Sequence, residues 1–305
     1  MSSPDLLVIT GPTATGKTRL GALVAHRLGG EVISADSRQV YRGMDIGTGK
    51  DLQDFIVEGQ PVPYHLIDIR EPGYKYNVYE FQQDFLRAYE EIRSRGRLPL
   101  LVGGTGLYIE AVLKGYRLIR VPADPAFRAS LEGKSLEELT AMLASYKKLH
   151  NTTDIDTRKR AIRALEIEHY YAAHAGETEA FPQIRALVFG IAVDRDTRRA
   201  NISRRLRQRL KEGMIEEVER LAKEGIPWED LEYYGLEYKY IALYLQGQLG
   251  YDEMVRRLET AIHRFAKRQM TWFRGMQRRG IPITWIDGSL PEEEKSKIIC
   301  EAAGR

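Results

Sequence analysis

The chain has 305 residues, of which 43% are hydrophobic and 29% are charged, and its formal net charge is +3. This length and composition are typical of a globular protein with one large α/β domain, or with a core and a small insert. They exclude a disulfide framework, because Cys300 is the single cysteine, and a membrane helix, because no apolar run approaches roughly 20 residues.

The first predicted strand, residues 6–9, follows the N-terminus without a signal-like segment, which favours a cytoplasmic protein that contacts no membrane. Next come GPTATGKT, which matches the phosphate-loop pattern G-x-x-x-x-G-K-[ST], and a predicted helix, residues 18–28. Backbone N–H groups of such a loop, a helix N-terminus and a lysine together hold a polyphosphate. We therefore predict a diphosphate or nucleotide site formed by Gly11, Pro12, Thr13, Ala14, Thr15, Gly16, Lys17 and Thr18. Lys17 is expected to reach terminal phosphate oxygens, and the Thr18 hydroxyl is expected to bind Mg²⁺.

The second predicted strand, residues 31–34, is followed by a polar run, Asp36, Ser37, Arg38 and Gln39. In a doubly wound sheet these side chains lie beside the phosphate loop, because ligand sites gather at the C-terminal ends of parallel strands. An acid at Asp36 can hold a magnesium-bound water, cap the next helix or act as a general base, and its spacing favours the first two roles. Asp68 lies at the end of a third predicted strand, residues 65–69. It is expected either to hold a water bound to Mg²⁺ or to be a buried structural acid.

A predicted helix over residues 78–95 and a strand over 98–102 lead to the turn Gly103-Gly104-Thr105. The two glycines allow close approach of the backbone, and Thr105 offers a hydroxyl toward the same crevice. A glycine-rich turn is a weak signal by itself. The turn becomes informative because it is expected to lie beside the C-terminal ends of the first two predicted strands.

After residue 115 the strand pattern stops, and short helices are predicted, the clearest over residues 136–149 and 158–173. The strand pattern resumes over 187–193 and 283–286, while the stretch 198–279 is predicted to be mostly helical with a break at 225–227. Alternating buried strands and helices predict an α/β fold, a P-loop NTPase-like doubly wound parallel sheet with a helical insert domain. The expected domains are a first part of the core, an insert, and a return to the core with C-terminal helices: 1–119, 120–183 and 184–305.

Two segments, residues 195–211 and 264–279, concentrate arginine and lysine, and Asp196 is their single acid. Clustered bases beside aromatic residues suit a nucleic-acid backbone or a phosphorylated substrate. Solvated faces of two amphipathic helices would give the same pattern, and charge alone favours that interpretation.

Four segments together resemble one family, the tRNA dimethylallyltransferases, also called tRNA isopentenyltransferases. They are GPTATGKT, ISADSRQVYRGMDIGTGK, HLIDI and LLVGGTGLYIEAVLKG, in that order and at similar spacing. The likeness continues more thinly through RKRAIRALEI and AKRQMTWFRG, and so touches most of the chain.

The resemblance implies transfer of a dimethylallyl group from dimethylallyl diphosphate to the N6 amine of the adenosine 3′ of the anticodon in tRNA, with release of pyrophosphate. It implies Asp36 as the base, with Lys17, Thr105 and Mg²⁺ at Thr18 acting on the leaving diphosphate. The target base must leave the stack of the anticodon stem-loop to reach this crevice. The protein is expected to be a monomer, and the basic segments become candidates for RNA contact. The implied tRNA-binding residues are Asp36, Ser37, Arg38, Gln39, Arg128, Lys159, Arg160 and Arg163.

The chain departs from the family pattern at Asn201, where members usually carry an arginine that helps to hold the diphosphate. Arg198, Arg204 or Arg205 must then supply that contact, or it is missing. In addition, Leu236 follows Gly235 where a tyrosine is usual, and the insert is shorter than in typical bacterial members.

Three other functions stay open. One is transfer of dimethylallyl to free AMP, ADP or ATP, against which the insert and its arginines favour tRNA. A second is an ATP-binding small-molecule kinase or ATPase, which would leave the matches at 36–39 and 103–105 unexplained. The third, suggested by Asn201, is an RNA-binding relative without activity.

Overall fold

The computed structural model describes residues 4–146, 155–174 and 181–304. The chain forms two compact units, the first made of Met1–Lys114 with Gln183–Arg305 and the second of Gly115–Pro182. We expected an insert over residues 120–183, and the second unit spans 115–182.

The first unit is built on a parallel sheet of six strands in the order β5-β2-β6-β1-β7-β8. All five neighbouring pairs are parallel, which confirms the predicted doubly wound α/β class. The β1, β2 and β6 strands are buried along their whole length, as expected for strands covered on both faces, and β2 buries Glu31 and Ser34 beside its apolar Val32 and Ile33. The strands are β1 (Leu6–Thr10), β2 (Glu31–Ser34), β5 (Tyr64–His65), β6 (Pro99–Gly103), β7 (Ala186–Ala192) and β8 (Thr284–Asp287).

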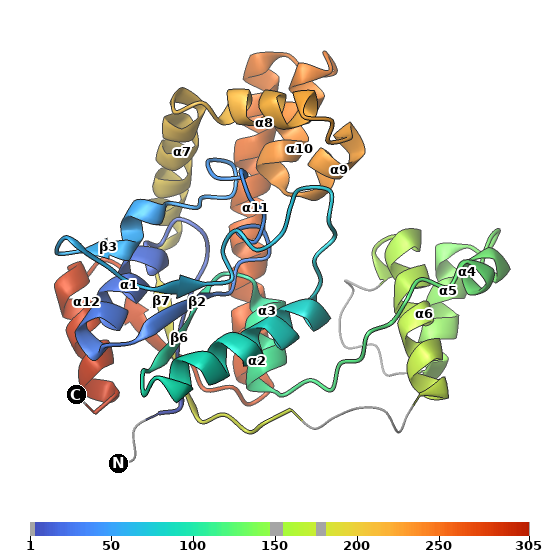
Figure 1. Cartoon of the computed structure of the whole chain (residues 1–305). Helices are drawn as coiled ribbons and strands as arrows, with labels where there is room; N and C mark the ends of the chain where they lie inside the picture. The colour runs from blue at the N-terminus through green and yellow to red at the C-terminus, as the bar shows by residue number, and fades with distance from the viewer. Residues whose placement is uncertain (1–3, 147–154, 175–180, 305) are drawn as a thin grey trace. The chain divides into compact units, whose positions relative to one another are not determined.

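Helices cover both faces of this sheet (Figure 1). On one face α1 (Lys17–Leu28) and α12 (Glu292–Ala302) pack over a core that includes Leu7, Ile9 and Val102. On the other face lie α2 (Val78–Ser94) and α3 (Gly106–Leu113) (Figure 1). The helices predicted at 18–28 and 78–95 are therefore confirmed to within a residue at each end.

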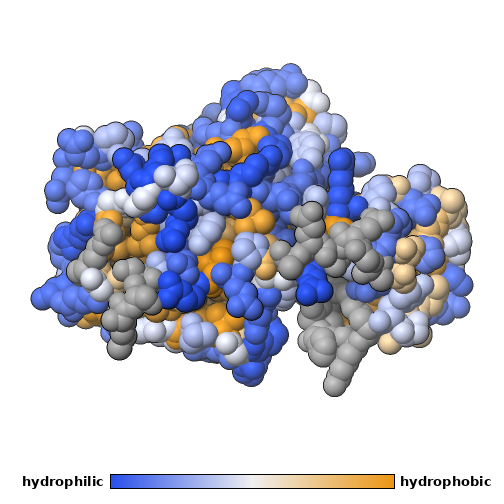
Figure 2. Space-filling view, turned by 60° about the horizontal axis from the view of Figure 1, so that its bottom comes forward, coloured by the Kyte–Doolittle hydropathy of each residue, from blue (hydrophilic) through white to orange (hydrophobic). Residues whose placement is uncertain are grey.

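Five helices lie between β7 and β8, and they confirm the predicted helical stretch with its break at residues 225–227. The helix α11 runs past the sheet edge at which β1 and β6 end, and contacts α3, α7 and α10. The helices are α7 (Arg195–Lys211), α8 (Met214–Lys223), α9 (Trp228–Tyr233), α10 (Leu236–Leu245) and α11 (Tyr251–Arg278). Among the described residues, no helix has both the length and the apolar character required to cross a bilayer. On the face in Figure 2, hydrophilic residues cover most of the surface and apolar patches show between them.

The strand predicted at 65–69 is wrong beyond its first residue, since β5 ends at His65. Leu66 and Asp68 have φ angles of 63° and 55°, which no strand residue adopts, so the chain turns away from the sheet there. Leu66 and Ile67 are buried all the same, which accounts for their apolar character. Between β2 and β5 lie a short 3₁₀ helix, η1 (Leu52–Phe55), and a hairpin of β3 (Ile56–Val57) with β4 (Gln60–Pro61), which the sequence patterns did not predict.

The second unit is helical, with α4 (Pro125–Ser130), α5 (Leu136–Tyr146) and α6 (Arg158–Ala173). The prediction for α6 is confirmed, whereas residues 147–149 of the helix predicted at 136–149 lie outside the described residues. The unit has a small core of its own, formed by Leu131, Leu139, Leu143, Ala161, Ala164 and Leu165.

Candidate active site at the strand ends

Three sequence motifs lie at neighbouring strand ends. The sheet order places β2, β6 and β1 side by side, so the segments that leave Ser34, Gly103 and Thr10 start from one edge. The Thr10 hydroxyl donates to the Gly103 carbonyl at 3.0 Å, which joins the first residues of two of these segments. The structure thus brings the phosphate loop, the Asp36 run and the Gly-Gly-Thr turn together, as the sequence predicted.

Hydrogen bonds within the phosphate loop hold its conformation. The Thr15 hydroxyl donates to the Pro12 carbonyl at 2.9 Å, and the Lys17 amine donates to the same oxygen at 3.2 Å. Gly16 has a φ of 72°, a left-handed conformation that lets the loop enter α1 with its first N–H groups pointing to the loop. This is an anion-binding geometry, because the loop amides, the helix N-terminus and the lysine converge.

Burial sets the charge of Lys17. Removal from water lowers the pKa of Lys17 to about 8, the nearby Asp36 carboxylate raises it, and the Arg205 guanidinium lowers it further. A bound anion stabilises the charged form of this amine strongly, because the anion replaces the water that burial has removed.

Thr105 connects the second and third strand ends. Its hydroxyl oxygen accepts the Ser37 N–H at 3.1 Å, and its own N–H donates to the Ala35 carbonyl at 3.1 Å. Asp36 Oδ1 accepts the Arg38 N–H at 2.9 Å, so the carboxylate caps a turn after β2, where the sequence had suggested the cap of a helix. Asp36, Thr105 and Lys17, the three predicted catalytic residues, therefore share one site.

Gln269 of α11 holds two of these segments, and we did not single it out from the sequence. Its side-chain oxygen accepts the Thr13 N–H at 2.9 Å, and its amide nitrogen donates to the Gly104 carbonyl at 2.9 Å. A Cβ on Gly104 would lie 2.6 Å from that nitrogen and 3.4 Å from Lys17 Cε, so glycine is required for this close approach. The only sequence signal was that Gln269 falls within AKRQMTWFRG.

A polar pocket of about 550 Å³ opens between the phosphate loop and α7. Among the arginines offered in place of the usual one at Asn201, Arg204 and Arg205 line this pocket and Arg198 does not. Asn201 accepts a hydrogen bond from Arg204 at 2.8 Å, so it orients an arginine on the same helix. The lining residues are Ala14 to Thr18, Asp51, Asp54, Val193, Asp194, Thr197, Asn201, Arg204, Arg205, Gln208, Arg209, Glu212 and Asp287 to Ser289.

Arg209, a further arginine of α7, is a pocket residue that the sequence analysis missed. It is buried, and its guanidinium contacts Asp51 Oδ2 at 3.0 Å, while Arg205 contacts the same oxygen at 3.3 Å. Two arginines thus share one carboxylate that is 55% exposed. Because the Asp51 carboxylate is exposed, an incoming anion can take its place beside the two guanidinium groups.

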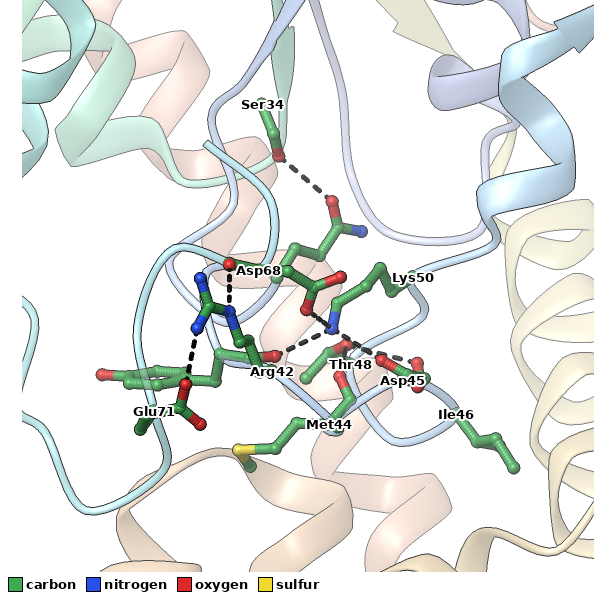
Figure 3. A network of polar contacts seen from close by, with 12 residues as sticks. Ser34, Arg42, Met44, Asp45, Ile46, Thr48, Lys50, Asp68 and Glu71 are labelled. Atoms are coloured by element: carbon green, nitrogen blue, oxygen red, sulfur yellow. Dashed lines mark hydrogen bonds and ion pairs between the residues drawn. The ribbon is translucent and has the colours of Figure 1, made fainter. Parts of the chain in front are cut away.

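The loop after Gln39 is held by a buried lysine (Figure 3). The Lys50 amine donates to the Tyr41 carbonyl at 2.8 Å and to Asp45 at 2.6 Å, and it also pairs with Asp68. Asp68 therefore has a structural partner, although its side chain is 35% exposed and not buried as the second predicted role requires. Gln39 is also buried, where it donates to the Gly49 carbonyl at 3.0 Å and accepts from Ser34 at 3.1 Å, so its amide serves the fold of this loop.

Two of the four predicted RNA-contacting residues of the second unit, Arg128 and Arg163, pair with Glu166. Burial alone would raise the pKa of this carboxylate, but Arg128, the Asp124 N–H and Arg163 lower it to about 2. Arg128 is bidentate to Glu166 at 2.8 Å for both bonds, and Arg163 pairs with it too. Lys159 is exposed, and Arg160 pairs with Asp156 one turn away.

Metal binding at the loop would rest on oxygen ligands from few side chains. The described residues contain no group of three or more His, Cys, Asp or Glu side chains placed to hold a metal ion. Thr18 lines the pocket together with Asp51 and Asp54. A hydroxyl and carboxylates are the donor types that suit Mg²⁺, which keeps several waters and takes phosphate oxygens as further ligands.

Comparisons with known proteins show the family of this chain. A model of the family described as IPP transferase matches residues 39–276, and one described as isopentenyl transferase matches residues 4–60. The tRNA dimethylallyltransferase 2 of Bacteroides fragilis is 62% identical over 299 residues, which cover 98% of each chain. The protein of the same name from Phocaeicola vulgatus is 60% identical over 300 residues, again 98% of each chain.

Two solved structures are similar to this chain. The tRNA isopentenylpyrophosphate transferase of Bacillus halodurans has a TM-score of 0.71 at 35% identity, over 98% of this chain and 95% of that one. A eukaryotic dimethylallyltransferase acting on tRNA has a TM-score of 0.74 at 22% identity, over 93% of this chain and 73% of that one. The second likeness supports the fold alone.

Proposed function

The chain belongs to the IPP transferase family, and on that premise we propose that it transfers a dimethylallyl group from dimethylallyl diphosphate to the N6 amine of the adenosine 3′ of the tRNA anticodon. The observation that carries the proposal is the meeting of the phosphate loop, Asp36 and Thr105 at three adjacent strand ends. ATPases also place a carboxylate beside a phosphate loop, so it is the family match that favours transfer from a diphosphate over hydrolysis of ATP. A tRNA substrate also suits a cytoplasmic protein.

The donor diphosphate is assigned to the phosphate loop, where the N–H groups from Ala14 to Thr18 and the Lys17 amine would face it, because Pro12 has no N–H and the Thr13 N–H donates to Gln269. Leaving-group charge grows as the C1–O bond breaks, and donors fixed before the reaction stabilise that charge without reorganising. Mg²⁺ bound at the Thr18 hydroxyl would supply further neutralisation of the diphosphate.

Asp36 is assigned as the general base that accepts the N6 proton. The adenine N6 forms a bond to C1 of the dimethylallyl group, the C1–O bond breaks, and the N6 proton passes to the Asp36 carboxylate. Thr105, whose hydroxyl already lies at Ser37, would place its O–H near the oxygen that leaves with pyrophosphate. An aromatic amine is a weak nucleophile, so a positioned carboxylate contributes directly to the rate.

The arginines of α7 take over the contact that Asn201 cannot make. Arg205 and Arg209 line the pocket beside the phosphate loop, and each forms an ion pair with Asp51. We assign the outer oxygens of the diphosphate to these two guanidinium groups, which bind phosphate more effectively than an ammonium at such a geometry.

Contacts to tRNA are divided between the two units. Ser37 and Arg38 lie next to Asp36 and would position the extruded adenosine, whereas Gln39 would act by holding the loop. In the second unit, Lys159, Arg160, Arg163 and Arg128 are assigned to the RNA backbone, the last two while also holding Glu166.

Incubation with Mg²⁺ and labelled dimethylallyl diphosphate tests this function. Unmodified tRNA, AMP and ATP are offered in turn, and label is expected in tRNA. Label in the mononucleotides only would show a free-nucleotide acceptor instead. With no label in any acceptor, turnover of ATP would place the protein among kinases or ATPases.

A further inference from the structure

Two exposed tyrosines each lie against an arginine. Tyr233, at the end of α9, is 42% exposed, and the Arg38 guanidinium lies 5.0 Å from its ring centre. Tyr74, in the loop before α2, is 45% exposed, and the Arg70 guanidinium lies 5.6 Å from its ring centre. Large aromatic rings kept at the surface beside guanidinium groups are typical of surfaces that stack nucleobases. We call these four residues the tyrosine–arginine platform.

The two halves of the platform are fastened to each other. The hydroxyl of Tyr234, which is fully buried, accepts the Gly73 N–H and donates to the Tyr74 carbonyl at 3.2 Å. Lys75 and Asp230 form an ion pair at 3.2 Å between the same two segments, and the loop runs beside α9 in Figure 1. The Tyr234 ring packs edge-on against Tyr41 at 4.6 Å. Both exposed rings therefore project from anchored backbone, which lowers the entropy lost when a base stacks on them.

One end of the platform lies beside Asp36, the proposed general base. Arg38 donates its N–H to Asp36 Oδ1 at 2.9 Å and directs its guanidinium to the Tyr233 ring. Its guanidinium is also among the charges that lower the pKa of Tyr41, which burial raises to about 12. One residue thus connects the reacting centre to an exposed aromatic surface.

We propose that the platform stacks the unpaired nucleobases that flank the target adenosine in the anticodon loop. This inference rests on the proposed function. Extruding one base leaves its neighbours without a stacking partner, and an aromatic surface beside the site compensates for that loss. The guanidinium groups of Arg38 and Arg70 can continue the stack or face the loop phosphates, which an aromatic side chain alone cannot do.

Binding of a fluorescent anticodon stem-loop to Tyr233→Ala and Tyr233→Phe tests the platform. Stacking on an aromatic side chain contributes enough that we expect Tyr233→Ala to weaken binding about tenfold, while Tyr233→Phe binds within about twofold of the wild type. The matched control is Tyr251→Ala, another exposed tyrosine, 47% exposed and packed against Tyr244. It is expected to bind as the wild type does.

Stem-loops with an abasic nucleotide just 5′ or just 3′ of the target adenosine identify the stacked base. At the stacked position, removal of the base and Tyr233→Ala are expected to cost no more together than either costs alone. Fully additive losses at both positions would overturn the platform, as would wild-type affinity in Tyr233→Ala or equal losses in the Ala and Phe variants. Label transfer to tRNA by the wild type tests the proposed function separately, so failure of the platform leaves that function standing.

Discussion

The Lys17 amine makes donor binding sensitive to pH. Because burial lowers its pKa to about 8, the amine is charged below pH 8 and loses its proton above it. The charged form binds the diphosphate, so affinity for dimethylallyl diphosphate should be constant near pH 7 and fall by up to about tenfold per pH unit well above pH 8. Equilibrium binding between pH 6.5 and 9.5, with Mg²⁺ fixed, measures this.

Lys17→Arg serves as the control for this pH dependence, since a guanidinium keeps its charge over the whole range. Its donor affinity should be flat with pH, whatever its absolute value. A wild-type Kd that stays constant up to pH 9.5 would contradict a lowered pKa at Lys17.

Gln269 positions the donor loop relative to Thr105. Gln269→Leu removes both of its hydrogen bonds and leaves the Thr13 N–H and the Gly104 carbonyl without that partner. We expect kcat to fall about 10- to 100-fold, since small misplacements of reacting groups have effects of that size, with a smaller change in KM. Steady-state kinetics on tRNA give both constants.

Gln277→Leu is the matched control on the same helix. Gln277 also makes two side-chain hydrogen bonds, to the Ile283 carbonyl at 3.2 Å and from Trp285 Nε1 at 3.0 Å, but at the C-terminal end of α11, about two turns beyond Gln269. Its loss should lower the free energy of unfolding by about 1 kcal/mol and leave kcat unchanged. A Gln269→Leu variant with wild-type kcat would remove Gln269 from the positioning role.

At the scale of elements, α7 supplies the arginines for the donor. Arg209→Met should raise the Kd for dimethylallyl diphosphate about 10- to 100-fold, because a charge-assisted hydrogen bond to the anion is lost. Asp51→Asn should lower the Kd a few-fold, because the carboxylate competes with the diphosphate for the guanidinium groups of Arg205 and Arg209. Calorimetric titration with the donor and Mg²⁺ measures both effects.

Arg199→Met controls for the loss of charge on α7, since Arg199 is exposed and does not line the pocket. Its donor affinity should match the wild type. Arg209→Met binding as tightly as Arg199→Met would mean that Arg209 serves only to hold Asp51.

Local sequence patterns predict an element when the residues that determine its structure lie close together in the chain. The phosphate loop and α1 were predictable because the glycine spacing, the buried strand and the helix follow each other directly in the chain. The strand at 65–69 was not, because an apolar run indicates burial but does not separate a strand from a buried turn. There, the left-handed Leu66 and Asp68 and the ion pair with Lys50 decide the backbone path.

Contacts between distant segments account for what the sequence did not reveal about the site. Gln269 meets Thr13 across 256 residues, and no periodicity encodes such a pair. Likewise, Arg209 stands among many arginines of α7, and only the fold shows that it turns toward Asp51 while Arg199 is exposed. Asp36 and Thr105 were accessible because each directly follows a predicted parallel strand, and parallel strand ends meet at one edge.

At the scale of the molecule, the small core of the second unit lets RNA binding and donor binding be tested apart. Arg160→Glu reverses a charge that forms an ion pair with Asp156 in which both side chains are exposed, so the unit should remain folded. Arg128 and Arg163 are unsuitable for this test, because they neutralise the buried Glu166, and their loss would leave that carboxylate underpaired.

We expect Arg160→Glu to weaken binding of tRNA several-fold at low salt and to reduce the slope of log Kd against log salt by about one, while the Kd for dimethylallyl diphosphate stays unchanged. Lys297→Glu is the matched reversal in the first unit, on α12, where Lys297 pairs at 3.8 Å with Glu301 one turn away. It should affect neither ligand, because α12 packs on α1 through Ile299 and Ala303 and contributes no residue to the donor pocket. If Arg160→Glu keeps wild-type tRNA affinity and salt slope, Arg160 does not contact the RNA backbone. The RNA contacts of this protein would then have to be sought on the first unit, beginning with the exposed arginine and lysine side chains of α11.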